Sequence, residues 1–317
     1  MIKFSNNIED YPEGIVLPID KPYRWTSADV IRKVKYAACR HFGKKNLKVG
    51  HAGTLDPLAT GILLVCIGPA TRRAEELQRS AKEYVAGISF GATTPSFDLE
   101  KEIDRFFPTD GVSEESIRAA LPAFLGEQDQ MAPLFSAKSV DGVRAYETAR
   151  KLYKQGLPVA DTDILQANRI TIYDLELLRY SPLLTPPELP LRSIPLTSDG
   201  GFTPVTSPAS PCSSMLQSQH ARTAGSAGAL LVREGESLPS EVKRNERIHV
   251  ADISGTMLPS ASIRIACSKG TYIRAFARDL GEALGTGAFL NSLRRTQNGG
   301  FSIEDAIPLA AALSSLS

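Results

Sequence analysis

The chain has 317 residues, of which 42% are hydrophobic, and its 36 basic residues nearly balance its 35 acidic ones. This length allows one large domain or two ordinary ones with a buried core, so the chain is not a short peptide module. The net charge of +1 excludes a histone-like polycation and an acidic disordered tail, although local basic patches can hide behind a neutral sum.

Residues 1–14 lack the basic start and apolar run of a signal peptide, and no segment reaches the roughly 18–20 apolar residues of a membrane span. We therefore expect a soluble, cytoplasmic protein with no membrane contact. The four cysteines are far apart and form no C-x-x-C pair, which argues against a zinc site and favours reduced thiols.

The first predicted elements are a helix and two strands. Residues 26–29 have the form of a capping box, and apolar residues then recur at helical spacing, which predicts a helix over about 27–41. The apolar run 62–67 is typical of a buried strand. Apolar residues alternate with others over 84–90, which predicts a half-buried strand.

The later elements complete a mixed pattern. Ser113 and the two glutamates after it predict an N-capped helix that reaches Phe124. Alternating apolar residues at 170–172 and 263–267 predict strands, and an apolar stripe over 273–284 predicts a helix ended by glycine. Strands and helices do not alternate regularly, so we expect an α+β protein with a largely antiparallel sheet.

Between about 181 and 247 the composition shifts to Pro, Ser, Thr and Gly, with little hydrophobic periodicity. Such a segment buries too little apolar surface to offset an ordering entropy of roughly 1–2 kcal/mol per residue. Because strand patterns resume beyond it, we expect a flexible insertion within a single domain that spans residues 1–317. An arm that becomes ordered on RNA is the alternative.

The densest motif runs from Gly50 to Gly61 and leads into the apolar run 62–67. Its glycines allow a ligand to approach the backbone closely, and Pro57 pushes Asp56 toward an extended conformation. The motif thus displays the Asp56 carboxylate on a loop before a buried strand. An Asx turn before proline is the alternative, and the spacing does not match a P-loop.

The run from Gly50 to Arg72 resembles the sequence around the catalytic aspartate of the TruB-type tRNA pseudouridine-55 synthases. Further segments match the family in order, namely Asp20–Pro22 with Trp25–Ser27, Lys82–Tyr84, Phe135–Lys138 with Gly142–Glu147, Cys267–Arg274, and Gly281–Arg295. The resemblance covers most of the chain outside the proline-rich insertion. It implies a pseudouridine-synthase fold, in which helices flank a mixed, largely antiparallel sheet with a central RNA-binding cleft.

The resemblance implies an isomerase that converts uridine-55 in the T loop of tRNA to pseudouridine. The N-glycosidic bond is broken and remade to C5 of the same base, so we expect no cofactor and no metal. The implied partner is the tRNA T stem-loop, and we expect a monomer. Asp56 matches the catalytic aspartate, either as a nucleophile at ribose C1′ or as a base at C2′, and both routes need an ionised carboxylate.

Other matched residues surround that aspartate. Arg274 is the expected ion-pair partner, because a guanidinium within about 4–6 Å lowers a carboxyl pKa and fixes its direction. Tyr84 matches the tyrosine that stacks on the target base, and Tyr272 and Leu293 match positions that line the nucleotide pocket. By pattern alone, Arg274 could be a surface residue and the other three could be packing residues.

Two further residues have alternative interpretations. His51 matches a histidine that contacts the flipped nucleotide, where groups that replace lost stacking are expected. A lone loop histidine is its other interpretation, and with no second histidine at ligand spacing we expect no metal role. Lys21 matches a lysine that supports the active-site floor, and a solvated phosphate contact would look the same in sequence.

Two basic segments border these residues. Residues 20–51 contain nine Lys/Arg against two acidic residues, and residues 264–295 contain six against two. Either segment alone could be a solvated helix face. Because both flank one site, we expect them to form a phosphate track.

The match also departs from the family. Bacterial members often continue into a C-terminal PUA-like RNA-binding module, and only about a dozen residues follow Asp305, so we expect no such module here. A tRNA-binding folding chaperone with vestigial catalysis and a guide-RNA-dependent relative are the alternatives, and the intact set of Asp56, Tyr84 and Arg274 favours the enzyme.

Overall fold

Ten strands form one mixed sheet within the part of the chain that the computed structural model describes, residues 3–133, 135, 139–140, 143–144, 151, 155, 167–182 and 248–317. Their order is β14 (Ile307–Pro308), β1 (Ile15–Lys21), β3 (Thr60–Ile67), β12 (Ala288–Asn298), β4 (Lys82–Phe90), β11 (Ser260–Cys267), β10 (Asn168–Ser181) and β7 (Gly126–Gln130), with β2 (Val49–His51) beside β3 and β13 (Phe301–Ser302) beside β12. The β1/β14 and β3/β12 pairs are parallel and the others antiparallel. The α+β, largely antiparallel sheet predicted from the sequence is confirmed.

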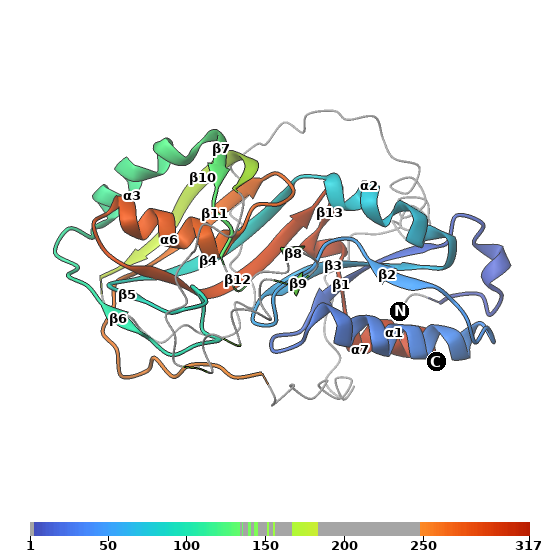
Figure 1. Ribbon diagram of the computed structural model, residues 1–317. Coiled ribbons are helices and arrows are strands. Elements are labelled where there is room, and N and C mark those ends of the chain that lie inside the picture. The colour runs from blue at the N-terminus through green and yellow to red at the C-terminus, as the bar shows by residue number, and fades with distance from the viewer. Residues whose placement is uncertain are drawn as a thin grey trace, which may run out of the picture.

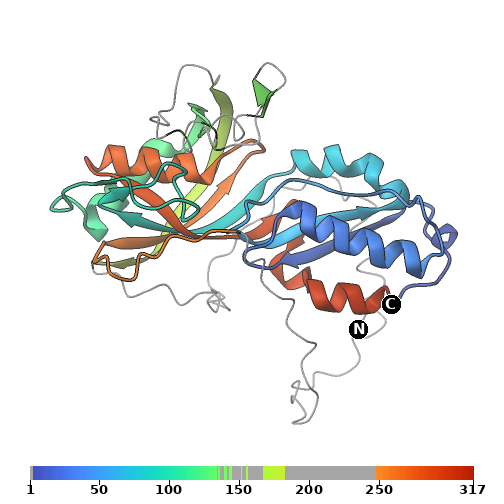
Figure 2. The same cartoon turned by 60° about the horizontal axis from the view of Figure 1, so that its bottom comes forward.

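Strands β4 and β12 cross the middle of the molecule and join two lobes (Figure 1). One lobe carries α3 (Glu114–Ala120) and α6 (Ile273–Ala283), and the other carries α1 (Ser27–His41), α2 (Ala74–Arg79) and α7 (Leu309–Ser315). Figure 2 shows α1 and α7 together on one face of the second lobe, with α2 on the opposite face. The remaining short elements are η1 (Ile8–Asp10), η2 (Gly68–Arg73), η3 (Leu121–Phe124), η4 (Ile303–Asp305), the pair β5 (Ala92–Thr93) and β6 (Arg105–Phe106), and the pair β8 (Ser139–Val140) and β9 (Val143–Arg144).

Strand β3 is covered on both faces, which explains its continuous apolar run. Leu63 and Val65 belong to the same core as Val34 of α1, whereas Leu64 packs on the other face with Leu77 of α2. A strand buried on both sides needs no polar alternation. The buried strand predicted at residues 62–67 is confirmed.

Helix α1 begins with the predicted capping box, since the Thr26 hydroxyl accepts from the Asp29 N–H and the Asp29 carboxylate accepts from the Thr26 N–H. The helix predicted over 273–284 is also present, as α6. The helix predicted to reach Phe124 ends at Ala120 instead and continues as η3. Pro122 has no N–H to extend the α-helical ladder, which accounts for the difference.

The prediction of a half-buried strand over residues 84–90 is wrong. Strand β4 is buried along nearly its whole length, because β11 and β12 flank it and side chains cover both faces. The hydroxyl of Ser89 is fully buried and accepts from the side-chain amide of Asn291 at 2.9 Å. That hydrogen bond explains how a polar residue alternates with apolar ones without reaching water.

The insertion predicted at about 181–247 lies almost entirely outside the described residues. Ser181 of β10 pairs with Ser260 of β11, so residues 182–259 connect the two strands of an antiparallel hairpin. The described end of this connection packs against the loop between β5 and β6, since the Ala251 N–H donates to the Leu99 carbonyl at 2.8 Å. Ile253 joins both residues in one buried cluster.

Candidate active site

Asp56 lies on the loop between β2 and β3, and buried side chains hold the backbone on both sides of it. The Ser27 hydroxyl accepts from the Leu55 N–H at 3.0 Å and lies 3.1 Å from the Leu55 carbonyl oxygen. Lys21 Nζ donates to the Pro57 carbonyl at 3.2 Å. The carboxylate itself remains 38% exposed. The loop therefore presents Asp56 to solvent from a fixed backbone.

Lys21 is fully buried, so the phosphate contact considered from the sequence is wrong. Besides Pro57, its ammonium donates to the carbonyls of Pro22 at 3.1 Å and Trp25 at 2.6 Å. Burial lowers the pKa of Lys21 to about 7, while the negative charge of Asp56 partly opposes this effect. Lys21 ties the loop after β1 to the loop that carries Asp56.

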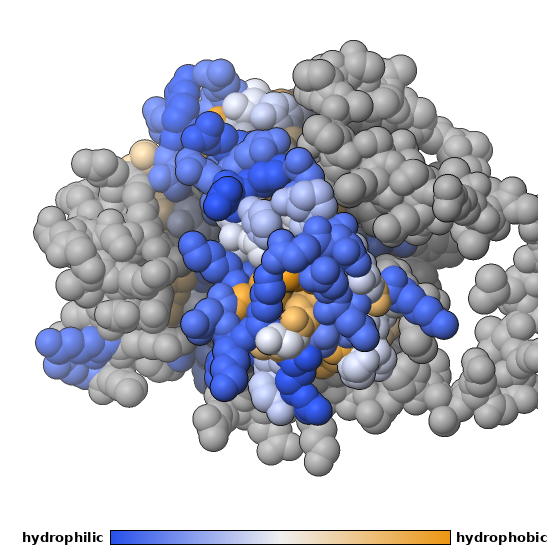
Figure 3. Space-filling model, turned by 90° about the vertical axis from the view of Figure 1, so that its right-hand side faces the viewer, coloured by the Kyte–Doolittle hydropathy of each residue, from blue (hydrophilic) through white to orange (hydrophobic). Residues whose placement is uncertain are grey.

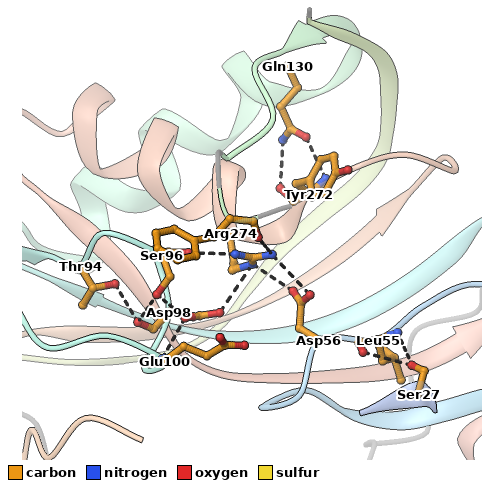
Figure 4. A network of polar contacts seen from close by, with 11 residues as sticks. Ser27, Leu55, Asp56, Thr94, Ser96, Asp98, Glu100, Gln130, Tyr272 and Arg274 are labelled. Atoms are coloured by element: carbon orange, nitrogen blue, oxygen red, sulfur yellow. Dashed lines mark hydrogen bonds and ion pairs between the residues drawn. The ribbon is translucent and has the colours of Figure 1, made fainter. Parts of the chain in front are cut away.

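Arg274 lies in the first turn of α6, and its buried guanidinium faces Asp56 (Figure 4). Nε donates to Asp56 Oδ2 at 3.0 Å and Nη2 to Oδ1 at 3.3 Å, which makes the pair bidentate. The other donors reach the carbonyls of Ser96 at 3.1 Å and Phe135 at 2.9 Å. Burial alone would lower the pKa of Arg274. The negative charges of Asp56 and Asp98 outweigh this effect, so the pKa lies above its ordinary value. The guanidinium stays charged and fixes the direction of the Asp56 carboxylate.

A second carboxylate, Asp98, lies at the same guanidinium. Its Oδ2 is 3.6 Å from Arg274 Nε, and its Oδ1 accepts from the Ser96 hydroxyl at 2.6 Å and the Glu100 N–H at 2.9 Å. Burial raises the pKa of Asp98, Arg274 opposes this shift, and Asp56 adds to it. Arg274 is thus held between two carboxylates, one buried and one open to solvent.

The sequence does not identify Asp98, because it is one of several acidic residues in 98–104 and no spacing marks it. Its orientation comes from Phe97, whose φ of 54° is a left-handed conformation that bulky residues rarely adopt. The Phe97 carbonyl accepts from the Leu290 N–H of β12 at 3.0 Å, which stabilises this turn. Such backbone strain is typical of functional sites and leaves no simple mark in a sequence.

Asp56, Asp98 and Arg274 border a small hollow whose remaining walls are Leu58, Ala59, Leu99, Leu290, Asn291, Ser292 and Leu293. The hollow is open to solvent, and the space in which a water-sized sphere can be centred is about 20 Å³.

The residues expected to contact the substrate lie in different settings. Leu293 lines the hollow, whereas Tyr84 and Tyr272 are not among its lining residues. Tyr272 precedes α6, and the Gln130 side chain accepts from its N–H at 2.8 Å and donates to its carbonyl at 3.1 Å (Figure 4). Tyr84 is 9% exposed on β4, and burial raises its pKa. The charge of Asp56 also acts on the Tyr84 hydroxyl, which places the two groups within electrostatic reach.

His51 ends β2, five positions before Asp56. Its Nδ1 is buried and has no hydrogen-bond partner among the described residues. Burial and the charge of Arg295 lower the pKa of His51, so the imidazole is neutral at pH 7. A neutral imidazole that is partly exposed can stack on a base.

The basic segment 264–295 does not form a phosphate track, which corrects the expectation from the sequence. Arg264 pairs with three carboxylates, Arg278 with Asp279, and Arg294 with Asp20. Arg274 and Arg295 are buried. Only Lys269 is exposed without an ion pair to a described residue.

The basic segment 20–51 keeps its exposed cations on α1 and the loop after it. Five of them form no ion pair with a described acidic residue, namely Lys33, Lys35, Arg40, Lys45 and Lys48. The loop and η2 enclose an open hollow of about 440 Å³ lined by Lys44, Lys45, Lys48 and Arg72 among others. Figure 3 shows that hydrophilic side chains cover most of the described surface at this end of the molecule.

Sequence relatives identify the family. A family model described as "TruB family pseudouridylate synthase (N terminal domain)" matches residues 40–186. A protein named tRNA pseudouridine synthase B from Phocaeicola vulgatus is 38% identical over 298 residues, which cover 94% of this chain and 91% of the relative. The chain belongs to the TruB family of pseudouridylate synthases.

Two more TruB-family relatives have the same printed name. The one from Flavobacterium johnsoniae is 36% identical over 302 residues, which cover 95% of each chain. The one from Thermus thermophilus is 36% identical over 292 residues, which cover 92% of this chain and 75% of the relative. As a TruB-family pseudouridylate synthase, the chain is an isomerase.

Solved structures with low sequence identity share the fold. A Cbf5–Nop10–Gar1 complex matches with a TM-score of 0.52 and 22% identity, covering 97% of this chain and 56% of the matched chain. An H/ACA RNP bound to a substrate RNA matches with a TM-score of 0.50 and 21% identity, over 97% of this chain and 55% of the matched one. These matches confirm the pseudouridine-synthase fold of the TruB family.

Neither a membrane-spanning helix nor a metal-ligand cluster occurs in the part of the chain that the structure describes. No described helix combines the length and apolar character that a membrane crossing requires. Among the described residues, no three His, Cys, Asp or Glu side chains are grouped so that they could hold a metal ion.

Proposed function

We propose that this TruB-family isomerase converts uridine-55 in the T loop of tRNA to pseudouridine. The observation that carries the proposal is the bidentate pair between the buried Arg274 and the half-exposed Asp56. The tRNA substrate is supported by the printed names of relatives that cover nearly the whole chain.

In the proposed reaction, the bond between ribose C1′ and uracil N1 breaks, the base turns, and a new bond joins C1′ to C5. The C5 proton is lost and N1 gains one, so no oxidant, reductant or outside group is consumed. Asp56 acts on the ribose, as a nucleophile at C1′ or as a base at C2′. Arg274 orients Asp56, and Asp98 orients Arg274 from its buried side.

The other site residues bind the extruded nucleotide. We propose that Tyr84 stacks on the target base, that Tyr272 and Leu293 complete its pocket, and that His51 contacts the flipped nucleotide. Extrusion requires a few kcal/mol of unstacking, so aromatic and apolar groups beside Asp56 compensate for the lost stacking.

The test is single-turnover release of tritium from tRNA labelled at C5 of uridine. We expect Asp56→Asn to abolish release while tRNA binding survives, and a transcript with cytidine at position 55 to release nothing from that site. Turnover by Asp56→Asn would contradict the role of Asp56. Activity that required a guide RNA would contradict the choice of substrate. We expect a cytoplasmic enzyme that acts as a monomer. Sedimentation with and without tRNA tests the monomeric state.

A further inference from the structure

Arg295 is among the largest fully buried side chains of the described structure, and the reaction as proposed does not use it. It lies on β12, where its backbone pairs in parallel with Gly61 of β3. A Cβ on Gly61 would lie 2.2 Å from the Arg295 carbonyl oxygen, so only glycine allows this approach. The Arg295 backbone therefore lies against the first residues of β3, which directly follow the loop that carries Asp56.

The Arg295 guanidinium donates to backbone carbonyls at both ends of that loop. Nε donates to Ile62 at 2.7 Å, Nη2 to Gly53 at 3.2 Å, and Nη1 to Thr54 at 3.5 Å. Ile62 follows the loop in β3, whereas Gly53 and Thr54 precede Asp56 by three and two residues. Buried carbonyls in a turn need donors that no neighbouring strand supplies, and the planar fork of arginine supplies several from one side chain.

No described carboxylate pairs with Arg295 within ion-pair distance. A buried charge without an acidic partner is unfavourable unless dipoles compensate it. Here the compensation comes from the loop carbonyls, so the loop and the charge stabilise each other. A neutral donor at this position would form weaker hydrogen bonds to the three carbonyls.

The charge also acts on every titratable group that faces it. These groups are Lys21 of β1, His51 of β2, Lys82 and Tyr84 of β4, and Cys267 of β11. Burial and the charge of Arg295 both lower the pKa of His51, Lys21 and Lys82. His51 is therefore a reporter of the charge that is separate from the chemical reaction.

We propose that Arg295 is a positioning residue, which clamps the two ends of the catalytic loop through its carbonyls and so holds Asp56 against Arg274. The proposal rests on the proposed role of Asp56. The two buried arginines then have different roles, because Arg274 contacts the reacting carboxylate itself, whereas Arg295 contacts the loop carbonyls and the Tyr84 hydroxyl.

The decisive variant is Arg295→Lys, which keeps the charge but reaches fewer carbonyls. Arg264→Lys on β11, which β4 separates from β12, is the matched control, because Arg264 pairs with Glu83, Asp174 and Glu176 and not with the loop. We expect Arg295→Lys to lower the single-turnover rate at saturating tRNA by about 10- to 100-fold with tRNA affinity within twofold. Amide exchange at residues 53–57 should accelerate about tenfold, and Arg264→Lys should change neither quantity.

Arg295→Gln removes the charge as well. In this variant the His51 pKa followed by NMR should rise toward that of an ordinary histidine, while in Arg295→Lys it should stay near the wild-type value. If Arg295→Gln does not fold, Arg295→Lys alone decides through rate and exchange. Wild-type rate and wild-type exchange in Arg295→Lys would overturn the proposal. If the wild type does not modify the T loop, the proposed function fails, while amide exchange still tests the clamp.

Discussion

Apart from the exposed Lys269, the cations of residues 264–295 contact carboxylates or carbonyls of the protein, whereas those of residues 33–48 are exposed to solvent. The first set lies on β11, α6 and β12, in the centre of the sheet or against it. The second lies on the outer face of α1 and the loop after it. A charge in a central strand must be compensated by the protein itself, while a charge on an outer helix face is free to meet an external anion. We therefore expect the inner set to control rate and stability and the outer set to control RNA affinity.

The largest expected effect is at Arg274. Arg274→Ala leaves Asp56 and Asp98 facing each other without their shared cation, and removing one partner of a buried charge pair costs about 3–5 kcal/mol. We expect a single-turnover rate at least about 100-fold lower and a reduced melting temperature. Arg274→Lys should recover the fold and little of the rate, since it cannot be bidentate. A near-wild-type rate in either variant would contradict the expectation that the inner cations control the rate.

Asp98→Asn should have the next largest effect. It keeps the shape and the hydrogen bond from Ser96 but removes the charge behind Arg274. Because a buried ion pair that loses one partner leaves the other charge uncompensated, we expect a rate about 10- to 100-fold lower with unchanged tRNA affinity. Asp104→Asn, an exposed acid of the same stretch, is the control and should leave the rate unchanged. Equal effects in both would remove Asp98 from the site.

Lys21 belongs to the segment 20–51 but is buried, unlike the exposed cations of that segment. It therefore tests whether burial, and not position in the sequence, decides the role of a cation. Its folded pKa of about 7 lies below the unfolded value of 10.5, so between these pH values the unfolded state binds more protons. The unfolding free energy should therefore rise with pH from about 7 to 10, by at most about 1.4 kcal/mol per pH unit. Urea denaturation measures it.

Lys21→Met should flatten this dependence, and the exposed Lys33→Met should leave it as in the wild type. Lys82, whose pKa burial lowers to about 8, adds a slope of the same sign and should remain visible in both variants. An unchanged slope in Lys21→Met would show that Lys21 is charged throughout this pH range.

The exposed cations should give a smaller effect, confined to binding. Replacing Lys33, Lys35 and Arg40 together by Gln removes three exposed cations, and with them up to three contacts to phosphates. We expect tRNA affinity to fall about tenfold, and the slope of log K against log salt to become shallower by about 0.7–0.9 for each phosphate that is no longer neutralised. The rate at saturating tRNA should stay within twofold. Arg118→Gln on α3, whose arginine already pairs with Glu114, is the control. A loss of saturating rate would contradict the division between the two sets.

The smallest effect is expected for the segment that separates the two sets in the sequence. Replacing residues 183–247 by a Gly/Ser linker of about 12 residues should keep the β10/β11 hairpin and residues 248–259 beside Leu99. We expect melting temperature and rate close to those of the wild type. A large loss of tRNA affinity would instead favour the alternative of an arm that becomes ordered on RNA.

Much of the fold and part of the site can be predicted from the sequence. The capping box at Thr26, the apolar run of β3 and the glycine that ends α6 are local signals, and each predicts its element. The motif of the Asp56 loop and its resemblance to a family identify that loop. The extent of α3 is predicted less well, because Pro122 ends an otherwise helical pattern.

What the sequence does not show depends on contacts between distant residues. Asp98 acquires its role from a strained Phe97 and from Arg274, which is 176 positions away in the chain. Arg295 is predicted to bind phosphate because a sequence shows charge but not burial. The same limit applies to β4, whose polar Ser89 resembles a solvent-facing residue in the sequence but bonds to Asn291 inside the fold.

The shared strands β4 and β12 also decide which partner must deform when RNA binds. Enzymes that close around a substrate do so about hinges, but here the two lobes are joined through the paired centre of one sheet. Opening them would break the ladder between β4 and β12, so the separation of Asp56 and Arg274 is set before RNA arrives. We therefore expect the paired backbone to keep Asp56 and Arg274 at a fixed separation, so that in the proposed reaction the RNA unstacks and turns its base toward Asp56.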